Sequence, residues 1–354
     1  MTLSRSISRH ARIISYFLIF AVLKMSFRAA KTKEIVIRLV DYKYTNKHVT
    51  GSKFGSKLKK FIEQSSRGLI KVTIKHCTIV VGVAYNKGRV YQLYSQIKSK
   101  TKTFPRDADY YVHFANPAVS RASGRHCVTW TSWTNTLHET MHLFGLHHAN
   151  SKLGTSGLRR SHDPYDCVTS FSPYMVPNSP HLLQLGWFKD AELDTLEFNK
   201  IYKLHLLRNF SSKDLKILYH QVPAETEGLF KRFYISLVDN PAKGQLFLAI
   251  HTLWGSTSSV LVGNYKVTKG KDYIDKASGL EFTITDSADK RIDIVFKCCN
   301  GVSIEEDLSV EPLCGCFDPD CDCIICEFEP DEKLGLPIED IEDISKLVEI
   351  IQEQ

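Results

Sequence analysis

The sequence predicts an α+β fold: a mixed region of helices and strands at about 31–190, an all-β, sandwich-like region at 191–300, and a cysteine-rich acidic tail at 301–354. Two patterns lead to this division. Before residue 190, runs with helical spacing of apolar residues alternate with β-branched runs, whereas after it only short alternating runs remain. With 354 residues and 43% hydrophobic composition, the chain is long enough to bury more than one core.

The N-terminal 1–30 segment is predicted to be a signal peptide. Three arginines, Arg5, Arg9 and Arg12, precede an apolar run from Ile13 to Leu23, which is too short for a confident membrane span. We therefore expect a secreted or extracellular protein. Residues 24–28 offer no clean pair of small residues for cleavage, so an uncleaved signal that anchors the protein in the membrane is the alternative.

The first half reads as an ordered series of strands and helices. Residues 127–133 are expected to form an edge strand, to which an extended substrate could add as a further strand. The elements expected before it are a strand at 34–41, an amphipathic helix at 54–65, a strand at 69–83, a weak second helix at 90–98 and a short strand at 110–114.

A metal-binding pattern follows directly, in which His138, Glu139, His142, Gly145 and His148 recur at fixed spacing. Residues four apart share one face of a helix, so His138 and His142 can present their imidazoles to one metal ion. Glu139 lies beside them as a candidate general base that takes a proton from the attacking water. Gly145 permits a sharp turn that brings His148 back as the third ligand.

The flanks of this segment support a packed helix rather than a solvated one. Thr134 or Asn135 can cap its start, and Leu137, Met141 and Phe144 give it an apolar side. His147 is a rival third ligand by adjacency, although the spacing favours His148.

The extended spacing resembles that of the metzincin zinc metallopeptidases, which carry a methionine turn beneath the metal. Met175, within Ser172-Pro173-Tyr174-Met175-Val176-Pro177, matches such a turn, and Tyr165-Asp166-Cys167 with Asn178-Ser179-Pro180 through Leu185-Gly186-Trp187 resembles the gametolysin family. The resemblance is specific between about 134 and 188. It implies Zn²⁺ held by His138, His142 and His148, Glu139 as general base, and Met175 as the floor of the site.

Two departures from that family pattern stand out. Residues 153–163 look like an insertion, which should alter a rim loop and hence specificity. Val176 occupies the position where the family usually has glycine after the methionine, and a β-branched residue cannot readily adopt a positive φ.

The region after residue 190 predicts a β-sandwich with no catalytic constellation of its own, and its His220 and His251 are interpreted as ordinary β-domain residues. The expected strands are 200–207, 214–219, 233–237, 245–251, 258–262, 280–285 and 292–297.

Ten cysteines, an even number, permit full pairing in an oxidising compartment. Five crowd between Cys314 and Cys326, where disulfides are favoured over thiolate ligation of a metal. Outside this cluster, Cys77, Cys127 and Cys167 are scattered along the first half.

The tail differs from the rest of the chain in charge. From Glu327 onward the chain has ten acidic residues and only two basic ones, Lys333 and Lys346. This tail therefore has a net charge of −8, and the rest of the chain carries +15. The basic body could bind polyanions, or the acidic tail could fold back and cover its basic surface. No basic stripe with interleaved aromatic residues predicts nucleic-acid binding. Residues 338–351 have the spacing of an amphipathic helix, with a loosely ordered end as the alternative.

Together these patterns predict a zinc-dependent endopeptidase that cleaves extracellular or surface proteins and takes a protein or peptide as its substrate partner. The alternative is a catalytically silent binding or adhesion protein with a zincin-like fold. The sequence does not indicate an oligomeric state.

Overall fold

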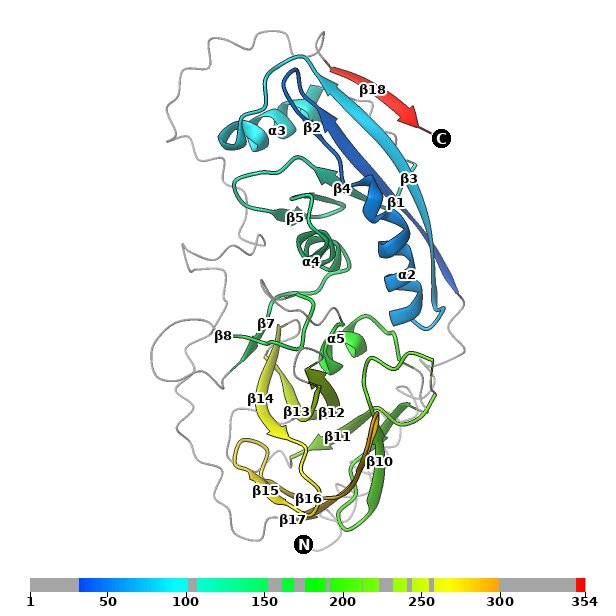
Figure 1. The fold of residues 1–354 in the computed structure, drawn as a ribbon, viewed down its shortest axis with the longest axis vertical. Coiled ribbons are helices and arrows are strands. Elements are labelled where there is room, and N and C mark those ends of the chain that lie inside the picture. Colours follow the sequence, from blue (N-terminus) through cyan, green and yellow to red (C-terminus); the bar gives the residue numbers. More distant parts are fainter. Residues whose placement is uncertain are drawn as a thin grey trace, which may run out of the picture. The chain divides into compact units, whose positions relative to one another are not determined.

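A computed structural model describes residues 32–100, 107–151, 161–168, 176–188, 192–211, 213–222, 232–240, 244–254, 258–298 and 348–353 (Figure 1). The described residues from Glu34 onward form one compact unit. The expected signal segment at 1–30 lies outside the described residues. Among the helices that are described, none is long and apolar enough to cross a membrane.

The first sheet has the strand order β18-β3-β1-β4-β6-β5, and β2 pairs with β1. β4 is parallel to both of its neighbours, β1 and β6, whereas β5 is antiparallel to β6. The predicted strands at 34–41, 69–83 and 110–114 are confirmed as β1, β3 and β4. The bounds are β1 Lys33–Lys43, β2 His48–Val49, β3 Ile70–Val81, β4 Tyr110–Phe114, β5 Arg121–Ser123, β6 His126–Thr129 and β18 Val348–Glu353.

The expectation of an edge strand at 127–133 is wrong. β6 ends at Thr129 and lies between β4 and β5, so the three-residue β5 forms the edge. The physical reason is a tight turn at Gly124, whose φ of +57° folds β5 back onto β6 as a hairpin.

The C-terminal prediction is also wrong for the residues that the structure describes. Instead of continuing an amphipathic helix, 348–353 form β18, which pairs antiparallel with β3 at the opposite edge of the sheet. β-branched residues favour a strand, and an unpaired edge of β3 would otherwise expose its backbone groups. The rest of the expected helix, 338–347, lies outside the described residues.

Helices cover this sheet through a shared apolar core. In α2, Leu58 and Ile62 are fully buried, and Phe61 contacts Trp133 of α4 with ring centroids 6.3 Å apart. In α4, Leu137 and Met141 are buried in the same core. The helices are η1 Ser52–Phe54, α2 Gly55–Ser65, η2 Lys87–Arg89, α3 Val90–Lys100, α4 Trp133–Leu143 and α5 Ser179–Gln184, so the predicted helices at 54–65 and 90–98 are confirmed.

The β-rich region contains two further sheets that enclose one buried core, as predicted for a sandwich-like arrangement. Phe282 and Phe296 on one sheet and Phe233 and Leu248 on the other belong to that core and are fully buried. One sheet has the order β10-β17-β16-β15 and the other β8-β7-β14-β13-β12-β11-β9. All seven strands expected after residue 190 are present, as β10 Ile201–His205, β11 Ile217–Gln221, β12 Arg232–Asn240, β13 Gln245–Trp254, β14 Ser258–Lys266, β16 Leu280–Ala288 and β17 Arg291–Cys298.

Within these two sheets, four short strands were not predicted, and two of them precede residue 190. β7 follows α4 and pairs parallel with β14, in register from Ala149 with Ser259. The larger sheet therefore includes strands on both sides of the expected boundary, although the division into domains itself stays a prediction. The four are β7 Ala149–Ser151, β8 Ser161–His162, β9 Leu193–Thr195 and β15 Asp272–Asp275.

Candidate metal centre

The helix that carries the site, α4, begins with a side-chain cap. Ser132 has an extended backbone, and its hydroxyl oxygen accepts a hydrogen bond from the backbone N–H of Asn135 at 3.3 Å. Capping residues satisfy amide groups that have no partner within the first turn. The prediction that Thr134 or Asn135 caps this helix is therefore wrong by two or three residues, since both lie inside its first turn.

Three histidines converge at this helix: His138 and His142 lie within α4, and His148 follows its end. The Nε2 atom of His138 lies 3.0 Å from Nε2 of His142 and 3.2 Å from Nε2 of His148. Within the described ranges, this is the one group of three or more His, Cys, Asp or Glu side chains whose ligand atoms lie within 4.8 Å of one another. All three side chains are half-buried.

These distances suit a small metal ion. Two nitrogens at about 2.0–2.1 Å from a tetrahedral zinc ion lie about 3.3–3.4 Å apart, close to the separations seen here. Three neutral imidazoles leave a fourth position open, which is the donor set of catalytic rather than structural zinc sites. The residues present therefore fit a zinc ion.

Gly145 makes the turn that brings in the third histidine. Its φ of +89° lies in the region that favours glycine, and its amide donates to the carbonyl of His142 at 2.9 Å. A Cβ built on this glycine would have no heavy atom within 4 Å, so the need for glycine is conformational rather than steric. His148 follows three residues later, immediately before β7.

The orientation of His142 is fixed by a contact on its far side. Its Nδ1 lies 2.6 Å from the carbonyl oxygen of Leu146, so Nδ1–H donates there and Nε2 faces the other two histidines. Such outer partners set the tautomer of metal-binding histidines. Burial lowers the pKa of His142 to about 4, which keeps the imidazole in the neutral form that metals require.

Glu139 lies on the buried side of α4, with 5% of its surface exposed. The pKa of Cys127 in β6 is raised mainly by burial and next by the negative charge of Glu139. The carboxylate of Glu139 therefore lies near that strand. A largely buried carboxylate on the helix that carries two of the candidate metal ligands can act as a proton acceptor.

No protein-family model, no curated protein and no solved structure matches this chain.

A buried polar network lies close to the histidines and was not predicted. Asp166 accepts from Nδ1 of His181 at 2.8 Å, and both side chains are fully buried. These two residues perturb the pKa of His142, so they lie near it. Because Asp166 and His181 are 15 residues apart and belong to different elements, the local spacing gave no signal of their contact.

A second carboxylate joins this network to the sandwich. Asp163 lies 3.0 Å from Nε2 of His251 and accepts from Nδ2 of Asn178 at 2.9 Å. The same amide of Asn178 donates to Ser259 of β14 at 2.7 Å. His251, interpreted above as an ordinary β-domain residue, is in fact a buried partner of an acidic residue 88 positions away.

Other sequence predictions concern His147, the expected methionine turn and the 153–163 insertion. His147 is half-buried and does not belong to the histidine cluster. Met175 and most of the 153–163 insertion lie outside the described residues. The carbonyl of Val176 accepts from the amide of Cys167 at 3.1 Å, and Val176 is not among the described residues with positive φ.

The cysteines of the first half do not pair. Cys77, Cys127 and Cys167 are free and buried, so full pairing of all ten cysteines is wrong for these three. Burial raises the pKa of each thiol, which makes them unreactive core residues. The 314–326 cluster lies outside the described residues.

Proposed function

We propose that this protein is a zinc-dependent endopeptidase of the metzincin type, resembling the gametolysin family. The observation that carries the proposal is the convergence of His138, His142 and His148 at distances that suit zinc, with Glu139 beside them on the same helix. Its proposed substrates are extracellular or surface proteins, reached through secretion or an uncleaved N-terminal anchor.

Each residue has a distinct role in the proposed reaction. Zinc bound at the three histidines supplies a Lewis acid that polarises the scissile carbonyl and makes a neighbouring water more acidic. Glu139 accepts the proton of the attacking water and returns it to the leaving amine. Leu146, through its carbonyl oxygen, holds His142 in the tautomer that leaves Nε2 available.

The substrate would bind as an added strand. β5 is the edge of the first sheet, and it packs against α4, which bears the histidines. An extended peptide could pair with the free side of β5 through main-chain hydrogen bonds. This replaces 127–133 as the proposed docking strand.

The alternative is a catalytically silent zincin-like protein that uses its sandwich for binding or adhesion. The two proposals differ in the role of Glu139, which a silent protein does not need. No basic stripe with interleaved aromatic residues favours a nucleic-acid partner, and none is proposed.

The test is proteolysis by the full-length protein with zinc present, compared with Glu139→Gln. Loss of cleavage by at least about 100-fold in Glu139→Gln, with one zinc per chain retained in both proteins, would support the endopeptidase. A chelator should abolish cleavage, and added zinc should restore it. If Glu139→Gln cleaves as fast as the parent, or if the parent binds no zinc, the proposal fails.

A further inference from the structure

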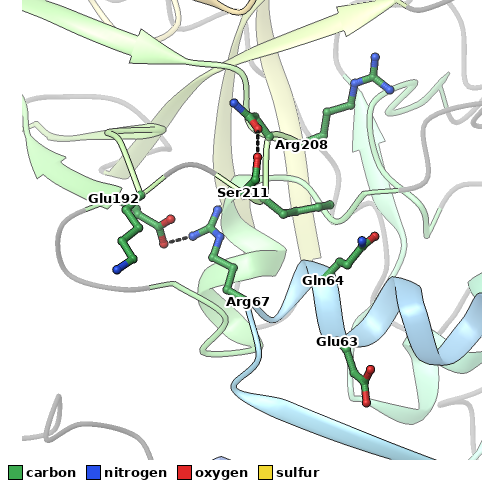
Figure 2. A pocket seen from close by; sticks show the side chains of 9 residues that line it. Glu63, Gln64, Arg67, Glu192, Arg208 and Ser211 are labelled. Carbon is green, nitrogen blue, oxygen red and sulfur yellow. Dashed lines mark hydrogen bonds and ion pairs between the residues drawn. The ribbon is translucent and has the colours of Figure 1, made fainter.

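A second polar pocket, separate from the histidines, opens where the end of α2 meets the chain that follows β10. It encloses about 540 Å³ (Figure 2). This volume lies in the range of small-molecule sites. None of its lining residues belongs to the metal centre. They are Glu63, Gln64 and Arg67 from α2 and the turn after it, Glu192, and Arg208, Asn209, Phe210, Ser211 and Lys213.

Arg67 is the central residue of this pocket. It occupies the turn after α2 with a φ of +54°, where glycine would be the less strained choice. Its side chain points from the end of α2 into the pocket (Figure 2) and is only 5% exposed. One guanidinium nitrogen, Nη1, donates to Glu192, while Nε and Nη2 are buried with no hydrogen-bond partner among the described residues.

Unpartnered charged donors are costly to bury, so two such nitrogens on one arginine call for an acceptor. Among the described residues, no second carboxylate accepts from them. The nearby Glu63 is already engaged, because its Oε1 accepts from the amide of Val72 at 3.0 Å.

The local charge points to the nature of that acceptor. Glu192 is fully buried and is shared by two cations, Arg67 and Lys216, whose Nζ lies 3.6 Å from its Oε1. Two buried cations therefore flank this one carboxylate. Lys213 adds a further exposed positive charge at the rim.

We propose that this pocket binds a small molecule that carries an oxyanion, a carboxylate or a phosphate group, with Arg67 as its anchor. The two free nitrogens of Arg67 form one edge of the guanidinium fork, which matches two oxygens of such a group. Lys213 also lines the pocket and contributes a further donor, whereas the Ser211 hydroxyl donates to Oδ1 of Asn209 at 2.9 Å. The site lies outside the proposed peptidase centre and does not depend on it.

The test is calorimetric titration of the full-length protein with inorganic phosphate and with succinate at constant ionic strength, and with uncharged succinamide as the control ligand. We expect saturable binding of one anion per chain and none of succinamide. A preference between phosphate and succinate identifies which oxyanion the pocket selects. Arg67→Gln should weaken binding at least tenfold, and Lys213→Gln about threefold or more.

Matched variants keep the result decisive. Lys203→Gln removes an exposed lysine of β10 that does not line the pocket and should leave binding unchanged. Because Arg67 is buried and Arg67→Gln can fail to fold, Lys213→Gln at an exposed lining position provides a folded alternative. Equal binding by the parent and Lys213→Gln, as expected if the anion sits at the histidine cluster, would overturn the proposal, as would the absence of saturable binding.

Discussion

Replacing Gly145 by alanine isolates the contribution of one turn to metal binding. Gly145 has a φ of +89°, and a Cβ there would meet no heavy atom within 4 Å, so Gly145→Ala adds backbone strain and no clash. A residue with a side chain pays about 1–2 kcal/mol for left-handed backbone. The free protein can release that strain by opening the turn, which moves His148 away from His138 and His142. Zinc binding must close the turn again and so restore the strain. At 1.4 kcal/mol per factor of ten, this strain should lower the affinity of the protein for zinc by about 5- to 30-fold.

The assay is competition for zinc between the protein and a chromogenic chelator, with Gly270→Ala as the matched control. Gly270 has a φ of +75° and equally empty surroundings, but it lies in the turn between β14 and β15. With zinc bound, both variants should lose about 1–2 kcal/mol of stability in denaturant, whereas only Gly145→Ala should lose zinc affinity. Zinc binding by Gly145→Ala within twofold of the parent would refute the role given to this turn.

Three further predictions address the ligand set, the buried network and the buried lysine. In the same competition, His148→Ala should weaken zinc binding by more than about 100-fold, a larger effect than removing a residue that only supports a metal ligand. His147→Ala should leave zinc binding unchanged. Equal losses in the two variants would reject His148 as the ligand. Burial raises the pKa of Asp163, but the charge of His251 and its hydrogen bonds outweigh this and lower that pKa. Their pairing therefore stabilises the fold fully above about pH 4, and the stabilisation is lost as the pH falls from there through the lower pKa of the folded state. Asp163→Asn should therefore cost roughly 1.5–3 kcal/mol in urea unfolding at pH 7 and less at pH 3, and a pH-independent difference would contradict this. Burial lowers the pKa of Lys216 to about 8, against about 10.4 in the unfolded chain, so folding is opposed while this lysine is protonated and stability should rise between pH 8 and 10. Lys216→Met should lack that rise in thermal unfolding, and an unchanged rise would assign it to another group.

The parts of the site that could be predicted are those encoded within about one helical turn. The four-residue spacing of His138 and His142, and the glycine turn before His148, are local and are confirmed as a cluster. Strands with clear alternation were also found, because a half-buried strand has a period of two. The cap at Ser132 was missed because Ser132, Thr134 and Asn135 are all good capping residues and lie within four positions of one another.

The missed features depend on contacts between distant segments. β5 and β7 have three residues each, too few to show a period, and they form because a neighbouring strand offers hydrogen bonds. Asp163 and His251 pair although they lie 88 residues apart, so no local sequence pattern indicates their contact. Residues 348–351 have helical spacing, yet they lie as a strand on β3, where tertiary pairing outweighs local preference.

The pairing of β7 with β14 has a consequence for how this protein can be divided. His148 is followed at once by Ala149, which is in register with Ser259 of the sandwich. A fragment ending near residue 190 would keep all three histidines but lose the strand that holds the segment after the third. The sandwich sheet thus holds the segment that follows the candidate metal ligands, and deletions or domain exchanges made at residue 190 should be judged by metal binding as well as by folding.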